Sequence, residues 1–186
     1  MRASGSARAS ALIVVVVAAL VAVLLPGTTG AANAAPRSSD FDLARMQPVN
    51  PDKYRSISYA NRGRHFFRAD GWLCQIGPQP GATACKGKPR TAPPGVIGVA
   101  IAGEQQGPYW VRPGTTFQLG PVSPFRAPTL HAGTRITVAD VTCAVPRRGV
   151  VVCRNWNRGF KVSRGSHTFM YPKGDRAHDR NPRSRA

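Results

Sequence analysis

The 186-residue sequence lacks the local motifs that most hydrolases carry. It has no G-x-S-x-G elbow, no H-E-x-x-H pair and no phosphate-binding loop, so nothing local supports a serine hydrolase or a metalloprotease. Acidic residues are few, with 8 Asp and Glu against 26 Lys and Arg. After Pro26 no segment shows a convincing helical period, which argues against a helical body.

The first 34 residues have the layout of a cleaved secretory signal. Arg2 and Arg8 give it a positive start, residues 11–25 form an apolar run, and an A-x-A site occupies 32–34. As a helix, the apolar run would cover about 22 Å, less than the roughly 30 Å hydrocarbon core that a retained anchor must span. We therefore predict export, with the signal helix 1–34 removed.

The rest of the chain divides into a body and two looser ends. Residues 35–51 are predicted to be a flexible lead-in, with Phe41 and Leu43 as candidates for docking on the body. Apart from two prolines, residues 172–186 contain no aliphatic or aromatic residue larger than Ala, so we expect a disordered basic tail. The body, 52–171, is long enough for one domain with its own core.

Two stretches of the body echo each other. They read "FFRADGWLCQIGPQPGATACKG" (66–87) and "ITVADVTCAVPRRGVVVCRN" (136–155). Each contains an apolar strand, Ala-Asp, a cysteine, a turn, a second cysteine and a basic residue. Repeated order of this kind indicates two similar hairpins, which would lie in pseudo-symmetric halves of one fold.

The four cysteines indicate two disulfides. An even number behind an export signal is typical of an oxidising compartment, and the echo selects Cys74 with Cys85 and Cys143 with Cys153. Spacings of eleven and ten residues, with no histidine nearby in sequence, are unlike those of zinc sites. We expect no metal and no cofactor.

Turn residues predict where the hairpins close. In the second unit, Arg147-Arg148-Gly149 would form a three-residue loop with a left-handed glycine. In the first, the four residues "PQPG" (78–81) would form the turn. Near the C-terminus, a loop "SRGS" (163–166) would place Val162 opposite His167 and Phe160 opposite Phe169.

These patterns predict an all-β fold. Short strands lie close together, and the chain has 17 prolines and 19 glycines. We expect a small single-domain sandwich or barrel with two disulfide-closed β-hairpins.

The pattern "F-x3-DGWLC-x-I … ACKG … VTCAV … VVC-x-N … GFKVSR", spread over 66–164, resembles a group of small exported proteins of actinobacteria that are described only as secreted proteins. The resemblance implies a signal peptide, two bridges and a β-rich exported domain. It carries no catalytic residue.

The formal net charge of +18 favours an anionic partner. Acidic polymers and membrane or cell-wall surfaces fit this charge, and no specific nucleic acid is expected. The alternative is that arginine has accumulated on solvated faces through compositional bias. The exposed binding candidates are Arg147, Arg148, Arg154, Trp156 and Arg158. The leading hypothesis is an exported, non-enzymatic, envelope-associated protein.

The alternative hypothesis is a small secreted hydrolase. His65, His131 and Lys161 could surround a phosphate as in a ribonuclease, although no motif ties them together. Asp70 and Asp140, matched in the echo, could form a glycosidase carboxylate pair. A simpler expectation is that both aspartates accept hydrogen bonds in turns.

Overall fold

A computed structural model describes residues 38–104, 106–115 and 117–175. The predicted signal peptide, the first residues of the lead-in and most of the predicted tail lie outside the described residues.

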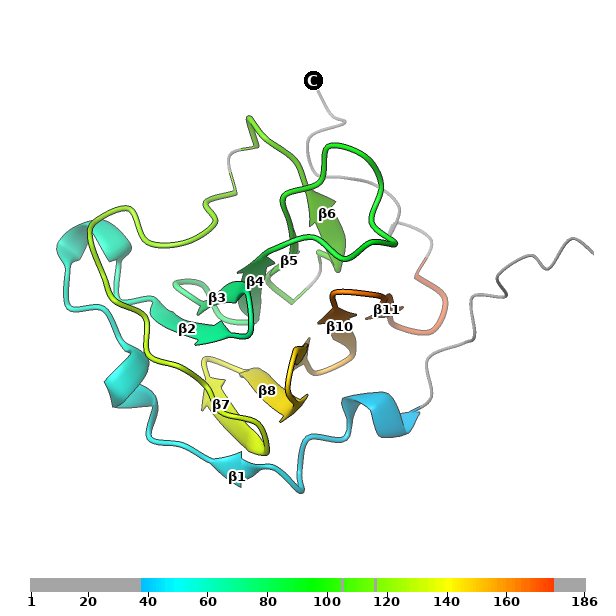
Figure 1. Cartoon of the computed structure of the whole chain (residues 1–186), viewed down its shortest axis with the longest axis horizontal. Coiled ribbons are helices and arrows are strands. Elements are labelled where there is room, and N and C mark those ends of the chain that lie inside the picture. The colour runs from blue at the N-terminus through cyan, green and yellow to red at the C-terminus, as the bar shows by residue number, and fades with distance from the viewer. Residues whose placement is uncertain (1–37, 105, 116, 176–186) are drawn as a thin grey trace, which may run out of the picture. The chain divides into compact units, whose positions relative to one another are not determined.

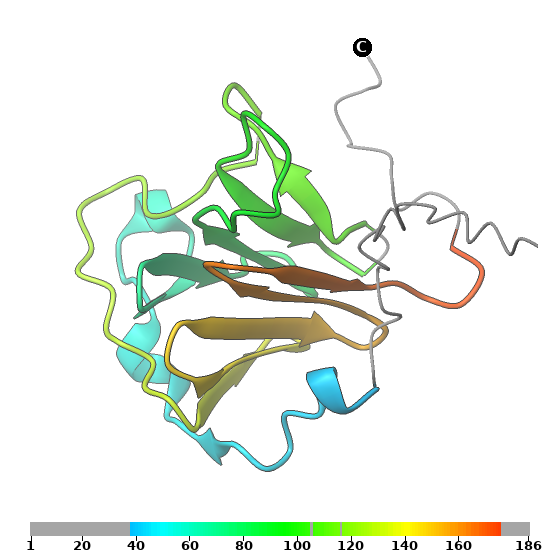
Figure 2. The same cartoon turned by 45° about the vertical axis from the view of Figure 1, so that its right-hand side comes forward.

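The described body is all-β, as predicted, and has two sheets stacked as a sandwich (Figures 1 and 2). The six-stranded sheet has the order β1 (Gln47–Pro48), β7 (Thr134–Val138), β8 (Val141–Arg147), β9 (Val150–Asn155), β10 (Arg158–Ser163) and β11 (His167–Met170). The five-stranded sheet has the order β2 (His65–Ala69), β3 (Trp72–Ile76), β4 (Ala82–Lys86), β5 (Gly98–Ala102) and β6 (Tyr109–Val111). Among the described residues the helices are short 3₁₀ turns, η1 (Ser38–Phe41), η2 (Pro51–Tyr54) and η3 (Tyr59–Asn61).

Each sheet is built on an antiparallel meander of consecutive strands. Strands β2 to β6 pair in chain order, and so do β7 to β11, while β1 adds a parallel edge to the second meander. In both meanders the disulfide joins the second and third strands. This correspondence explains why the two cysteine units look alike in sequence.

The first turn of each meander has two residues, both with positive φ. These are Asp70 (41°) and Gly71 (91°) between β2 and β3, and Ala139 (46°) and Asp140 (63°) between β7 and β8. Two positive φ values define a type I′ turn, whose twist matches that of the flanking strands. In the structure Asp70 therefore corresponds to Ala139, the first residue of the other turn. The similarity in sequence had instead matched Asp70 with Asp140, one position further on.

The β8–β9 hairpin has the predicted cysteine pair but a shorter turn. A bulge lies between Ala144 and Arg147, and Arg147 pairs with Val150. The three-residue loop predicted at 147–149 is therefore wrong, because the turn contains two residues. Pro146 has no backbone N–H to donate to a ladder, and a bulge is one of the few places where a strand tolerates it.

The other two predicted hairpin turns are confirmed. Between β3 and β4, the Gly77 N–H donates to the Ala82 carbonyl at 2.9 Å and closes the four-residue turn 78–81. Between β10 and β11, Val162 pairs with His167 and Phe160 with Phe169, as the loop 163–166 predicted.

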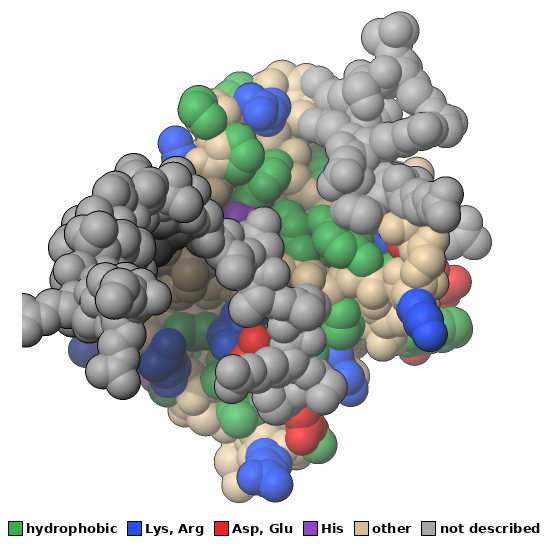
Figure 3. Space-filling model, turned by 90° about the vertical axis from the view of Figure 1, so that its right-hand side faces the viewer, with side chains coloured by type: hydrophobic (Ala, Val, Ile, Leu, Met, Phe, Trp, Pro, Cys, Tyr) green, Lys and Arg blue, Asp and Glu red, His purple; other side chains and the backbone are tan. Residues whose placement is uncertain are grey.

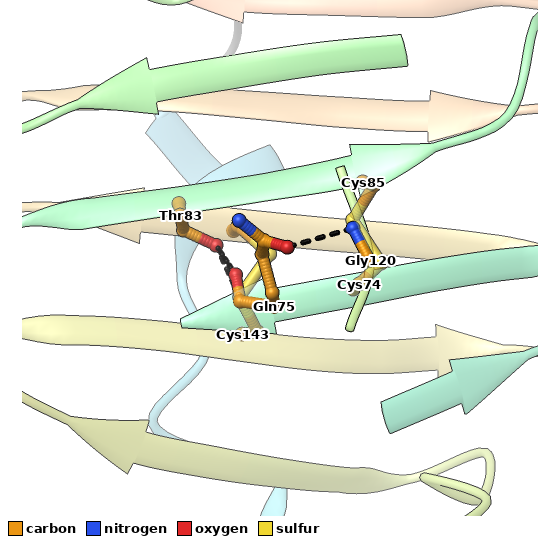
Figure 4. The surroundings of a disulfide bond; sticks show 7 residues. Cys74, Gln75, Thr83, Cys85, Gly120 and Cys143 are labelled. Atoms are coloured by element: carbon orange, nitrogen blue, oxygen red, sulfur yellow. Dashed lines mark hydrogen bonds between the residues drawn. A yellow bond between two sulfur atoms is a disulfide. The ribbon is translucent and has the colours of Figure 1, made fainter. Parts of the chain in front are cut away.

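Both disulfides are buried between the sheets. Cys74 is bonded to Cys85 and Cys143 to Cys153, with Cα–Cα distances of 4.0 Å. The Thr83 hydroxyl, on β4, lies 3.4 Å from the Cys143 sulfur of the opposite sheet (Figure 4). All four cysteines belong to the largest apolar cluster, which both sheets line.

Chain segments cover the outer face of each sheet. Phe41 and Leu43, each 2% exposed, pack on Ala144, Val150 and Val152 of the six-stranded sheet. Their predicted docking on the body is confirmed, and η1 and β1 lie within the predicted lead-in, 35–51.

The five-stranded sheet is covered by the segment after β6. Phe117 and Leu119 pack over the outer side of β4, β5 and β6. The buried side chain of Gln75 holds this cover in place. Its oxygen accepts from the Gly120 N–H at 2.8 Å (Figure 4), and its amide donates to the Gln118 carbonyl at 2.8 Å.

We predict that replacing either cysteine pair by alanine lowers the free energy of unfolding by about 3 kcal/mol, because each bridge closes a loop of about ten residues. Urea denaturation of Cys74→Ala/Cys85→Ala and Cys143→Ala/Cys153→Ala should give similar losses. Peptide mapping of the unreduced parent is the control, and a peptide linking the two halves would contradict the pairing.

Candidate functional site

The exposed binding residues predicted from the sequence do not form one site. Arg147 and Arg148 lie at the β8–β9 turn, whereas Arg154 and Trp156 lie at the β9–β10 turn. β9 separates the two turns, and its six residues span about 20 Å. Trp156 is 70% exposed, in agreement with its predicted position on the surface.

Arg148 belongs to a small structural cluster that links the two sheets. The Asp70 carboxylate accepts from the Gly149 N–H at 2.7 Å and lies 3.4 Å from the Arg148 guanidinium. Arg164 lines the same open hollow of about 440 Å³. Asp70 therefore has the expected role of a turn carboxylate, and Arg148, still 90% exposed, presents most of its surface to solvent.

Arg158 is buried, so its predicted exposure is wrong. Its residue exposure is 8%, and its guanidinium donates to the carbonyls of Glu104 at 3.0 Å and Gly107 at 2.6 Å. The same group forms an ion pair with Asp175 at 2.7 Å. Arg158 thus holds the loop after β5 and the start of the predicted tail against β10.

The structure separates Lys161 from His65, two of the residues proposed to surround a phosphate. Lys161 forms an ion pair with Asp40 at 2.8 Å on the outer side of the six-stranded sheet, whereas His65 lies in β2 of the other sheet. Among the described residues, no group of three or more His, Cys, Asp or Glu side chains could hold a metal ion.

The two aspartates of the proposed carboxylate pair are also separated. Asp70 lies in the turn before β3, whereas Asp140 lies in the β7–β8 turn. The β7–β8 turn contacts the chain that follows β3, because the Gly81 N–H donates to the Ala139 carbonyl at 2.8 Å. The five residues of β3 place these turns about 16 Å apart. This separation exceeds that of glycosidase carboxylates.

A half-buried aromatic group closes the sandwich between its edge strands β6 and β11. The Trp110 ring contacts His167 edge to face and Phe169 at a tilt, with centroid distances of 4.8 Å in both pairs, and the Phe169 ring meets Tyr171 edge to face at 6.1 Å. The His167 ring nitrogen Nδ1 is 2.7 Å from the Thr91 hydroxyl. Figure 3 shows hydrophobic side chains gathered on the face of the molecule toward β10 and β11, with Lys and Arg scattered around them. We interpret this group as packing.

Three exposed apolar side chains were not identified from the sequence. Ile57 and Tyr59 are 99% and 98% exposed, and Val122 is 62% exposed. For Ile57 and Tyr59, the sequence signal of exposure was the pattern Ile-x-Tyr inside the polar run "RSISYANRGR" (55–64). We name Ile57 and Tyr59 the apolar knob.

A buried asparagine holds the knob in place. Asn61 is fully buried, its amide nitrogen donates to the Ser56 hydroxyl at 2.8 Å, and its oxygen accepts from the Val122 N–H at 2.8 Å. The Ser123 hydroxyl donates to the Ser58 hydroxyl at 2.6 Å. Figures 1 and 2 show the two segments side by side, in cyan and yellow-green.

Two exposed arginines, Arg55 and Arg62, lie beside the knob. An open hollow of about 600 Å³ is lined by residues 55–59, Arg62 and Gly63. Arg64 is 9% exposed at the base of the loop, and its Nε has no hydrogen-bond partner. Burial, followed by repulsion from Arg62, lowers the pKa of Arg64. The site thus combines exposed apolar groups with concentrated positive charge.

No family model, curated protein or solved structure matches this chain significantly. Among the described residues, no helix has the length and apolar character needed to cross a membrane.

We predict that Arg158→Gln lowers the free energy of unfolding by roughly 3 kcal/mol, because it removes one partner of a buried ion pair and two charged donors to carbonyls. The exposed neighbour Arg154 provides the control: Arg154→Gln should change it by less than about 0.5 kcal/mol. Equal losses in urea denaturation would show that Arg158 is not an internal anchor.

Acidification should destabilise the fold through His65 and His167. Burial lowers the pKa of both below the usual 6.5, and Arg55 lowers that of His65 further, against an opposing effect of Asp52. The unfolded chain therefore binds these protons first as the pH falls through 6.5, so folded stability decreases there. Urea denaturation at pH 7 and pH 5 should show a smaller loss for His65→Gln/His167→Asn than for the parent. An equal loss would contradict this origin.

Proposed function

We propose that the protein is an exported, non-enzymatic protein that associates with the cell envelope by binding an anionic surface. The observation that carries this proposal is the excess of uncompensated positive charge on a disulfide-braced body. The formal net charge of the full chain is +18, and removal of residues 1–34, which contain Arg2 and Arg8 and no acidic residue, would leave +16. Ion pairs hold Arg148, Arg158 and Lys161, whereas Arg55, Arg62 and Arg154 form none among the described residues.

The two disulfides indicate an oxidising environment for the folded protein. Export through the signal-like segment 1–34 would deliver the chain to such an environment. Attachment to the envelope is the further step of the proposal, and it is supported by charge: bacterial and cell-surface polymers and lipid headgroups are rich in phosphate and carboxylate groups.

The position of the charges favours a broad contact over a specific pocket. Arg147 and Arg148 at one end of β9, and Arg154 and Trp156 at the other, are far enough apart to touch an extended anionic surface at separate points. Exposed cations distributed in this way raise the rate and strength of attachment and make both dependent on ionic strength.

The test is retention of the exported protein on heparin and on vesicles containing phosphatidylglycerol across a sodium chloride series. We expect retention to fall at least about tenfold between roughly 50 and 200 mM salt, because attachment releases counterions. Arg147→Gln/Arg148→Gln/Arg154→Gln should reduce retention on both supports and flatten the salt dependence.

A near-neutral exported protein of similar size is the control. Retention of the parent that is no stronger than that of this control on either support would refute the proposal.

A further inference from the structure

We propose that the apolar knob is a membrane-docking element, in which Ile57 and Tyr59 enter the interface of an anionic phospholipid bilayer while the two adjacent arginines contact its headgroups. This inference rests on the proposed attachment to an anionic surface and names lipid as that surface. Two kinds of observation carry it: the shape and composition of the knob, and the charge beside it.

The side chains of the knob project into solvent and do not line a closed pocket. Ile57 and Tyr59 expose 99% and 98% of their surface, which means that neither packs against a neighbouring element. The two side chains are two residues apart on one loop and together form an exposed apolar patch, a feature typical of interaction surfaces. Tyrosine is favoured at membrane–water interfaces, where its ring is buried and its hydroxyl stays hydrated, and an aliphatic neighbour adds burial deeper in the acyl region.

The charge beside the knob complements an anionic lipid. Arg55 and Arg62 line the hollow next to the two apolar side chains, whereas Arg64 is buried and donates from Nη1 to the Asn61 carbonyl at 3.4 Å. The Arg55 guanidinium lies over Gly63, since a Cβ at Gly63 would be 3.8 Å from it. Cations this close to inserted apolar groups lie at the depth of phosphate headgroups, where each strengthens attachment to an anionic leaflet.

The loop is fixed before it meets a partner. Asn61 binds Ser56 on one side and the Val122 and Ser123 N–H groups on the other. The Arg62 N–H donates a hydrogen bond to the Tyr59 carbonyl at 2.9 Å, which closes the 3₁₀ turn η3. Little conformational freedom remains to be lost on docking, so the apolar groups contribute more of their burial to affinity.

Among anionic surfaces, a bilayer is the one that uses both features. A polysaccharide or polyphosphate offers charge but no apolar interior for Ile57, and an acidic polypeptide would need a pocket to receive two projecting side chains. The bilayer interface accepts them without a shaped cavity.

The experiment measures binding of the full exported protein to three probes: phosphatidylcholine vesicles with phosphatidylglycerol, heparin, and polyglutamate. We expect Ile57→Ser/Tyr59→Ser to weaken vesicle binding at least about tenfold, because two apolar side chains lose their burial. Binding to heparin should stay within about twofold of the parent. The matched variant Ile57→Leu/Tyr59→Trp keeps apolar groups at the same positions and should bind vesicles within about threefold of the parent.

A second pair of variants tests the cations at equal net charge. Arg55→Gln/Arg62→Gln should weaken vesicle binding about tenfold or more, whereas Lys86→Gln/Lys88→Gln, which removes two exposed charges elsewhere, should weaken it less than about threefold. Thermal unfolding of every variant checks that the fold is retained, as expected for changes at exposed positions.

Vesicle binding that is insensitive to Ile57→Ser/Tyr59→Ser would overturn the inference while leaving salt-dependent attachment, and so the proposed function, intact. An equal loss on heparin or polyglutamate would overturn it in favour of a polymer or an acidic protein. Absence of retention on every probe would refute both proposals together.

Discussion

The fold depends on a constraint that each disulfide places on its pair of strands. Two bonded cysteines on adjacent strands must point to the same face, and neighbouring side chains alternate between faces. The disulfides of Cys74 and Cys143 therefore fix which face of each hairpin points to the other sheet. A one-residue shift in strand register would turn the apolar side chains outward, and the disulfides prevent it. The contact between Thr83 and the Cys143 sulfur lies where the two constrained hairpins meet.

Features that depend on neighbours in sequence were predictable. The cysteine pairs, the turn at 78–81 and the register around 163–166 follow from residue types within a few positions of one another. Features that depend on distant partners were not. Arg154 and Arg158 look equivalent in sequence, but only Arg158 meets carbonyl acceptors contributed by Glu104 and Gly107, about fifty residues earlier.

The same distinction applies to the surface. Composition shows that the protein is strongly basic, whereas the fold determines which apolar side chains are exposed on its surface. Ile57 and Tyr59 could have been core residues by type, and they stay outside because Asn61 bonds to a segment about sixty residues later and holds their loop against the body. When exposure depends on a hydrogen bond to such a distant segment, the neighbouring sequence gives little basis for predicting it. The one local indication was the presence of apolar residues in an otherwise polar run.

The short spacing of the bonded cysteines also affects how the covalent structure is reached. Partners ten or eleven residues apart lie within one hairpin, so each half can be oxidised as soon as its own segment is available. The nearest crossed pairing, Cys85 with Cys143, would close a much longer loop and is disfavoured about tenfold by chain entropy alone. Correct thiol pairing is thus encoded locally, and the two halves of the molecule can mature independently before they associate.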